Sequence, residues 1–148
     1  MSFSLRALAV SISFLTLGFG VAQAQTATSG LGQQWPNATD VSSNPNYHVY
    51  VFQRGAIKYV QVNDANGTVR AAVMLTPTGR FGTPVGSDAN NVATSDEPQA
   101  APASTASQTV YSDGANQIAV APQPNGSMRV MAVAVECKNP VECSSRGP

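Results

Sequence analysis

His48 is the only histidine of the sequence and therefore its only ordinary general base at neutral pH; it lies in the run NYHVYVFQ. A nucleophilic triad needs a carboxylate on one side of the ring and a hydroxyl on the other. Asp40 or Asp64 could approach the ring in the fold, but no sequence pattern brings them there. We therefore predict no catalytic residue and interpret His48 as a half-exposed strand residue. The alternative is a secreted hydrolase of unrecognised type that uses His48.

Two other patterns also lack the context that chemistry would need. Asp96-Glu97 is the only adjacent acidic pair, and it lies in a segment without the order that glycoside hydrolysis requires. The glycine-rich run GRFGTPVG, residues 79–86, does not join a strand to a helix as a phosphate-binding loop does. The sequence thus predicts neither an active site nor a cofactor.

The two cysteines, Cys137 and Cys143, occur together in CKNPVEC. In an oxidising compartment such an even pair is most simply a disulfide that closes a small loop. The spacing differs from the redox motif C-x-x-C, and a lone pair without a nearby histidine is a poor zinc site. We predict a structural disulfide and no metal site.

A binding surface depends on how the strands of residues 47–85 pair. Three β-branched and aromatic runs separated by Arg54-Gly55 and by DANG predict a three-stranded antiparallel meander. A two-residue loop at Arg54-Gly55 would place Phe52 opposite Ile57, Tyr50 opposite Tyr59 and His48 opposite Gln61. A loop at Asn66-Gly67 would place Val60 opposite Val73, Val62 opposite Ala71 and Tyr59 opposite Met74.

Alternation of side chains along these strands gives the meander two different faces. The valine face is the predicted core; it collects Val49, Val51, Val60, Val62, Val69, Ala71, Val73 and Leu75, with Lys58 as its only charge. The aromatic face mixes apolar area with hydrogen-bonding groups, a composition that favours contact with a ligand or a protein. Its candidate binding residues are His48, Tyr50, Phe52, Tyr59, Gln61, Arg70 and Met74. The alternative is that the hairpins of residues 109–136 cover this face.

Residues 109–148 are predicted to form a second β-hairpin region that ends in the disulfide-closed loop. At an offset of 59 residues this region resembles the first, with Gly55 matching Gly114 and Asn66-Gly67 matching Asn125-Gly126. Either the chain contains a duplication or the limited chemistry of turns produces the likeness. Pro122 and Pro124 predict that their strand is an edge strand, whereas MRVMAVAV predicts a central one.

The remaining segments complete the predicted organisation. Residues 1–24 have one early charge, an apolar run and a small-residue cleavage site, which is typical of a secretory signal peptide. Residues 25–46 are predicted to be a flexible N-terminal arm. Residues 86–108 contain no aromatic or basic residue, which predicts a disordered linker or a long loop.

Composition limits the partners of the exported chain. Beyond residue 24 it carries seven basic residues, since Arg6 is the eighth, and all eight acidic ones. A near-neutral chain predicts no nucleic-acid partner, and removal of the signal leaves no stable membrane span. We predict an all-β protein of two regions packed as a sandwich or an open barrel, exported to the periplasm or secreted by a bacterium. Its expected role is non-enzymatic binding of an unknown protein or an envelope-associated structural one; self-assembly is a further alternative.

Overall fold

The computed structural model describes residues 30–146, and these form two four-stranded sheets packed as a sandwich. The all-β prediction is confirmed. The predicted signal peptide lies outside the described residues. The first sheet has the antiparallel order β1-β2-β3-β4, with β1 (Tyr47–Arg54), β2 (Ile57–Asp64), β3 (Val69–Thr76) and β4 (Gly79–Gly82). The second has the order β5-β8-β7-β6, with β5 (Val92–Thr94), β6 (Gln108–Ser112), β7 (Asn116–Pro122) and β8 (Met128–Ala134). Only β5 and β8 run parallel.

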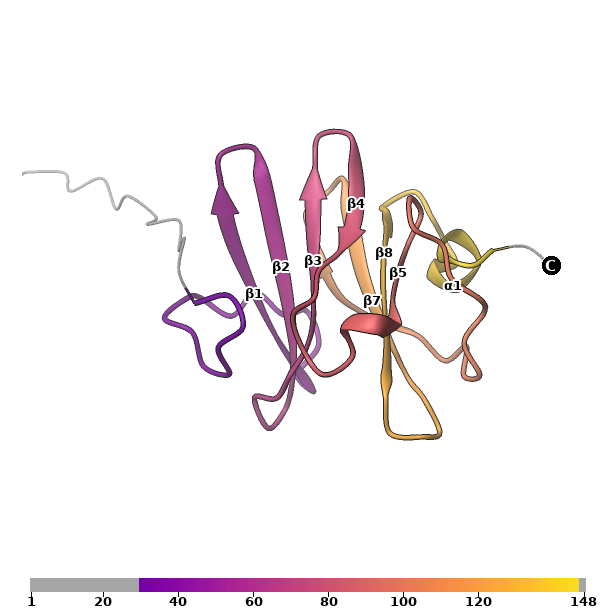
Figure 1. Cartoon of the computed structure of the whole chain (residues 1–148), viewed down its shortest axis with the longest axis horizontal. Coiled ribbons are helices and arrows are strands. Elements are labelled where there is room, and N and C mark those ends of the chain that lie inside the picture. Colours follow the sequence, from indigo (N-terminus) through magenta and orange to yellow (C-terminus); the bar gives the residue numbers. More distant parts are fainter. Residues whose placement is uncertain (1–29, 147–148) are drawn as a thin grey trace, which may run out of the picture.

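The core lies between the valine face of the first sheet and the inner face of the second. Val49, Val60, Val62 and Val73 are fully buried there against side chains of β6, β7 and β8, including Ile118. Figure 1 shows the layers side by side, from the N-terminal arm through the two sheets to the short helix α1 (Pro140–Ser144). Residues 109–136 therefore cover the valine face, while the aromatic face lies on the outer side of the first sheet, away from the core.

The first turn differs from the predicted one. Gly55 and Ala56, not Arg54 and Gly55, form the loop, so Phe52 lies opposite Tyr59 instead of Ile57. Gly55 has a φ of 60°, which suits the first central position of a II′ turn and explains the choice. In the same way Tyr50 pairs with Gln61 and His48 with Asn63. A shift of two residues preserves the two faces, which is why the partition of side chains holds.

The second turn gives the pairing that was predicted, by a different route. Val60 lies opposite Val73 and Tyr59 opposite Met74. The turn spans Asp64 to Gly67, with a hydrogen bond from the Gly67 amide to the Asp64 carbonyl and a positive φ of 83° at Gly67. This is a three-residue loop, and the register shift between Val62 and Asn63 restores the alternation that such a loop would otherwise disturb.

The strands and turns of the first meander recur in the second at the offset of 59. β7 begins 59 residues after β2, and β8 begins 59 residues after β3. The loop at Gly114 and Ala115 matches that at Gly55 and Ala56, and the Gly126 amide bonds the Gln123 carbonyl as Gly67 bonds Asp64. The likeness ends in β7. Ile118 and Val120 face the core there, whereas the offset of 59 predicts that the residues next to them in the sequence would face it.

The predictions of an edge strand at Pro122 and Pro124 and of a central strand at MRVMAVAV have different outcomes. β7 lies between β6 and β8, so it is not the edge strand that Pro122 and Pro124 predicted. Pro122 is the last residue of β7 and lies beyond the last pair with β6, Gln108 with Val120, so its missing N–H interrupts no ladder. β8 is a central strand, as predicted, with Val130 facing the core and Met131 packing under α1.

Residues 79–108 contain more regular structure than the sequence indicated. The first sheet has a fourth strand, β4, so the predicted three-stranded meander is incomplete. Where a disordered linker or long loop was predicted, the structure has a 3-10 helix η1 (Ala89–Asn91) followed by β5. β5 is fixed because Val92, Ala93 and Thr94 are buried beside β8. Within residues 30–146 no helix is long and apolar enough to cross a membrane.

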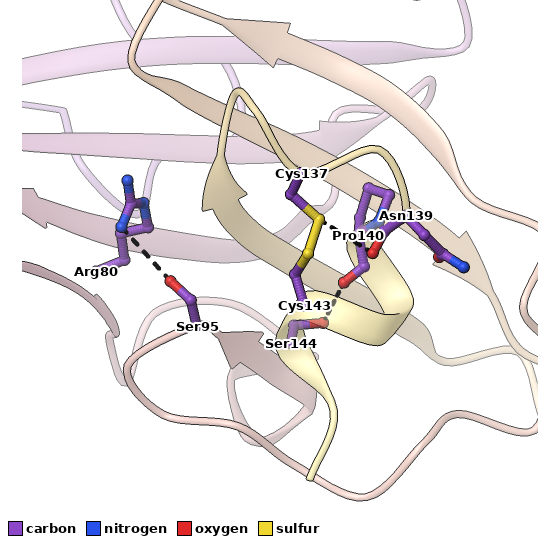
Figure 2. The surroundings of a disulfide bond; sticks show 7 residues. All are labelled: Arg80, Ser95, Cys137, Asn139, Pro140, Cys143 and Ser144. Atoms are coloured by element: carbon purple, nitrogen blue, oxygen red, sulfur yellow. Dashed lines mark hydrogen bonds between the residues drawn. A yellow bond between two sulfur atoms is a disulfide. The ribbon is translucent and has the colours of Figure 1, made fainter. Parts of the chain in front are cut away.

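The C-terminal segment covers the outer face of the second sheet. The predicted disulfide joins Cys137 to Cys143, which lies in α1 (Figure 2). Val141 packs against Met131, and the Ser144 hydroxyl donates to the Pro140 carbonyl at 2.6 Å. The disulfide therefore holds a helix too short to persist alone over the apolar surface of β7 and β8.

Removal of the disulfide should lower the free energy of unfolding by about 2 kcal/mol, the chain-entropy value for so short a loop. Urea unfolding of the Cys137→Ser/Cys143→Ser variant is the measurement. Wild-type protein under reducing conditions is the control and should lose the same amount. Equal stability of oxidised and reduced protein would contradict the prediction.

An ion pair links the two sheets near the β1–β2 and β6–β7 turns. Lys58 Nζ lies 2.6 Å from Asp113 Oδ2, so the one charge of the valine face has a partner in the second sheet. Burial alone would raise the pKa of Asp113, but hydrogen bonds from Lys58 and from the Asn116 and Ala115 amides lower it to about 2. Asp113 therefore favours folding when it is ionised.

Acid should remove this contribution. Because the pKa of Asp113 is lower in the folded state than in the unfolded chain, its stabilisation is fully present above about pH 4 and is lost as the pH falls through about 2. The Asp113→Asn variant should be about 1 to 2 kcal/mol less stable than wild type at pH 6, and the difference should shrink to well under half of that at pH 2. Urea unfolding at both values is the measurement. A difference at pH 2 as large as that at pH 6 would show that packing, not charge, is responsible.

Candidate functional site

The N-terminal arm covers part of the aromatic face, and two buried amides hold it there. Gln61 is fully buried; its Oε1 accepts from the Gly32 amide at 2.7 Å and its Nε2 donates to the Gln33 carbonyl at 2.8 Å. Asn63, also fully buried, donates to the Gln34 carbonyl at 2.6 Å. Residues 30–46, predicted to be a flexible arm, are thus tied to β2 by buried side chains whose hydrogen bonds the arm completes.

Trp35, the only tryptophan, rests on the second turn of the first sheet. A Cβ atom placed on Gly67 would lie 2.4 Å from the indole, so the absence of a side chain there permits the contact. The indole also meets the His48 ring edge-on at a centroid distance of 5.1 Å. Trp35 is nevertheless 58% exposed, so it packs on the surface of the sheet without being part of the core.

His48 has the carboxylate that sequence alone could not place. Its Nδ1 lies 2.7 Å from Asp40 Oδ2, and its ring stacks near Tyr50. Burial would raise the pKa of Asp40, but hydrogen bonds from the Val49 amide, the His48 ring and the Ser42 amide lower it overall. Within residues 30–146, Asp40 is the only hydrogen-bond partner of the ring, so no hydroxyl is hydrogen-bonded to it as the nucleophile of a triad would be.

Arg70 is engaged inside the protein. Its Nε lies 2.7 Å from Asp88 Oδ2, and its Nη2 donates to the Gly126 carbonyl at 2.9 Å. Asp64 contributes a longer contact of 3.7 Å. The guanidinium joins β3 to the segment before η1 and to the β7–β8 turn. Its charge is therefore engaged in contacts within the protein that hold these segments together.

The remaining candidates, Phe52, Tyr59 and Met74, form a row with Phe81 across the outer face of the first sheet. Phe52 pairs with Tyr59, Tyr59 with Met74, and Met74 with Phe81. Phe52 is buried, whereas the other three are half-buried. Tyr50, the neighbour of Phe52 on this face, is buried and contributes no free surface. The open part of the aromatic face therefore comprises Tyr59, Met74 and Phe81 and not the end near His48.

A small hollow lies at the β1 end of the row. It has a volume of about 190 Å³, and Leu31, Phe52, Gln53, Arg54 and Tyr59 line it. The sequence did not indicate Leu31, Gln53, Arg54 or Phe81 as binding residues. Leu31 had one signal, since it is the only large apolar residue between positions 25 and 34. Phe81 was missed because β4 itself was missed.

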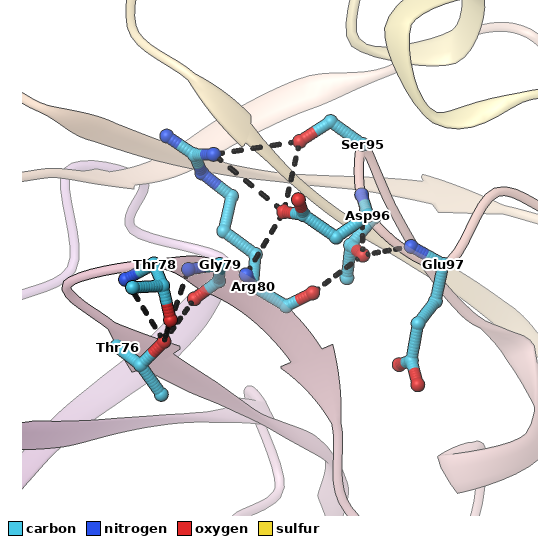
Figure 3. A network of polar contacts seen from close by, with 8 residues as sticks. Thr76, Thr78, Gly79, Arg80, Ser95, Asp96 and Glu97 are labelled. Carbon is cyan, nitrogen blue, oxygen red and sulfur yellow. Dashed lines mark hydrogen bonds and ion pairs between the residues drawn. The ribbon is translucent and has the colours of Figure 1, made fainter.

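The edges of β4 and β5 are capped by neighbouring groups. The Arg80 amide donates to Asp96 Oδ2 at 2.9 Å, and the Gly82 amide donates to Glu97 Oε2 at 2.8 Å. Figure 3 shows Asp96 beside Arg80, where it fills the place of a neighbouring strand. On β5, Gln99 Nε2 donates to the Val92 carbonyl at 2.6 Å. Such caps prevent pairing with another chain.

The edge of β1 is capped over only half of its length. The Val49 amide donates to Asp40 Oδ1, and the Val49 carbonyl accepts from the Val41 amide. Alternate residues of an edge strand direct their backbone groups outward, so Val51 and Gln53 do the same. Among residues 30–146 the outward groups of these two have no hydrogen-bond partner. This open half of β1 borders the hollow.

A larger cleft of about 600 Å³ lies where β4 meets β5, but its polar groups are mostly occupied. It is lined partly by Asp96, Glu97 and Arg146. Each carboxylate accepts from β4, and Arg146 Nε donates to the Pro98 carbonyl. The described residues contain no group of three or more side chains that could hold a metal ion.

Comparisons with protein-family models, with curated proteins and with solved structures give no match to this chain.

Proposed function

We propose that the protein is a non-enzymatic binding module that adds an extended segment of a partner protein to the open half of β1. One observation carries the proposal: among residues 30–146 the outward backbone groups of Val51 and Gln53 have no hydrogen-bond partner and lie beside a hollow, while the edges of β4 and β5 are capped. A strand added at an edge gains affinity from main-chain hydrogen bonds and specificity from pockets for alternate side chains.

The arm supports this function because it already uses the same edge. Asp40 lies opposite Tyr50 in an antiparallel bridge, and Val41 bonds the Val49 carbonyl. An extended segment can therefore lie against β1 without disturbing β2. A partner would occupy the edge of β1 next to the part that Asp40 and Val41 already cover. The disulfide and the absence of a membrane-spanning helix in residues 30–146 are compatible with export, and we propose that the module acts outside the cytoplasm.

The Gln53→Pro variant tests the proposal. The N–H of Gln53 points away from β2, so proline removes a donor that has no partner among the described residues 30–146. A library of random linear peptides selected on immobilised wild-type protein supplies the probes. The selected peptides should bind Gln53→Pro about tenfold more weakly, the effect of one lost hydrogen bond with its steric block.

Gln53→Val is the matched control, since it keeps the N–H and should retain binding. Hydrogen exchange should show new protection at the Val51 and Gln53 amides when peptide is bound. Peptides that bind Gln53→Pro and wild type equally would overturn the proposal. So would sedimentation showing that wild-type protein is a dimer and Gln53→Pro a monomer, because a second copy would then occupy the edge.

A hydrolase that uses His48 is the second candidate, and the contact with Asp40 favours it. Such an enzyme would need His48 for turnover, and a nucleophile would have to come from outside the described residues or from a rearrangement. We expect the His48→Ala variant to hydrolyse p-nitrophenyl acetate at the same rate as wild type. A large loss of rate would favour the hydrolase.

A further inference from the structure

We infer that the open half of β1 selects a segment with the pattern acidic–any–apolar, in which the apolar side chain fills the hollow and the acidic one pairs with Arg54. This inference rests on the proposed function and names the chemistry of the partner. It follows from the position of two groups along one edge, the hollow beside Phe52 and the guanidinium two residues further on.

The hollow determines the apolar position. Phe52 and Arg54 project from the outer face of β1, because they alternate with Val51, which packs against the core. In an added strand, the residue directly opposite Phe52 projects on the same face, about 5 Å away between Cβ atoms. It therefore meets the space bounded by Leu31 and Tyr59, whose volume of about 190 Å³ suits one aliphatic side chain.

The charge of Arg54 determines the acidic position. Arg54 is exposed and makes no ion pair within residues 30–146, unlike Arg70 and Arg80, which contact aspartates. The residue of an added strand that lies opposite Arg54 is two positions from the one opposite Phe52. Opposite charges at directly facing positions of a sheet stabilise the pair.

The direction of the added strand fixes the order of the two residues. The arm meets this edge in an antiparallel bridge, and antiparallel pairs are the more stable and the more common. In an antiparallel strand the residue facing Arg54 precedes the residue facing Phe52. The expected order along the partner is therefore acidic, any residue, apolar.

Fluorescence anisotropy with labelled peptides tests this inference. The reference probe is Thr-Thr-Glu-Thr-Leu-Thr-Thr, and the comparison probes replace Glu by Lys or Leu by Ser. We expect the Lys and Ser probes to bind wild-type protein at least about fivefold more weakly than the reference. In the Arg54→Ser variant the reference probe and the Lys probe should bind with equal affinity. The reference probe should still bind this variant more tightly than the Ser probe does.

The outcomes separate the pattern from the function on which it rests. If all probes bind wild type equally and Gln53→Pro weakens them all, strand addition is correct and the pattern is wrong. If the reversed probe, with Leu before Glu, binds best, the antiparallel order is wrong. If no probe binds and no library peptide depends on Gln53, the proposed function fails together with the inference.

Discussion

The Arg70→Ala variant should lose about 3 kcal/mol of its free energy of unfolding, more than any other single change considered for this protein. Asp88 is only 5% exposed, and Arg70 provides its charged partner at 2.7 Å. Removal of one partner leaves a buried charge without compensation, which costs about 3 to 5 kcal/mol. We place the expected value at the lower end because the Arg70 side chain is 16% exposed.

Arg80→Ala is the matched control for this prediction. Arg80 contacts Asp96 at 3.7 Å, in a pair more exposed than that of Arg70, so its loss should cost no more than about 1 kcal/mol. Urea unfolding of both variants, together with Arg70→Ala/Asp88→Asn, measures the coupling. The double variant should recover part of the loss, because the carboxylate is gone. A loss below 1 kcal/mol for Arg70→Ala would show that solvent compensates Asp88.

The role of Arg70 illustrates where prediction from the sequence stopped. Alternation placed Arg70 on the aromatic face, and the exposed arginine of a strand is a reasonable binding residue. Its actual partners come from the segment before η1 and from a turn of the other sheet. Contacts between segments so distant in sequence leave no periodic signal, so local patterns could not distinguish a structural arginine from a binding one.

Local patterns succeeded where local chemistry decides the structure. Alternation was sufficient to place Val60 opposite Val73, because a buried face tolerates no shift of one residue. The predicted two-residue loop at Asn66-Gly67 was wrong; the loop has three residues, and the register shift between Val62 and Asn63 restores the predicted pairing. The Gly55 loop was misplaced by one position, since either neighbour of that glycine can complete a two-residue turn. β4 and β5 were missed because each is short and depends on side chains of the other segment, such as Thr94 on the Arg80 carbonyl.

The binding face was only partly predictable for the same reason. Sequence could sort residues onto the face, but it could not say that the arm would cover one end and leave Tyr59 and Met74 half-buried at the other. That division depends on the side-chain amides of Gln61 and Asn63. In the sequence they look like ordinary polar residues of a strand, and their role is evident only once the carbonyls of the arm are located above them. The open edge at Gln53 likewise appears only when the caps on β4 and β5 are known.

The Gln61→Leu variant should release the arm from the sheet and cost about 2 to 3 kcal/mol. The substitution keeps the side-chain size but leaves the Gly32 amide and the Gln33 carbonyl without partners over a buried site, and each unmade hydrogen bond of this kind costs about 1 to 3 kcal/mol. The arm can recover part of this by moving into water. Urea unfolding measures the loss, and the fluorescence of Trp35, the only tryptophan, should shift towards that of a solvated indole.

The two equivalent glycines provide the control that separates arm release from general destabilisation. Gly67 and Gly126 occupy equivalent positions in two turns of the same kind, with φ of 83° and 80°. Alanine should therefore strain the backbone similarly at both positions. Only Gly67 lies under the indole; at Gly126 nothing lies within 4 Å of a Cβ atom. Gly67→Ala should therefore change Trp35 emission and Gly126→Ala should not. Equal emission in both variants would mean that the indole does not rest on this turn in solution.

Release of the arm should also weaken the binding proposed for β1. Leu31 forms one wall of the hollow and is held next to the Gly32 amide that Gln61 binds. Gln61→Leu should therefore bind the Glu-Thr-Leu probe more weakly, with little change for the Ser probe, which gains nothing from the hollow. If Gln61→Leu lost binding to both probes equally, the arm would be supporting the β1 edge itself. Unchanged binding to both would exclude Leu31 from the site.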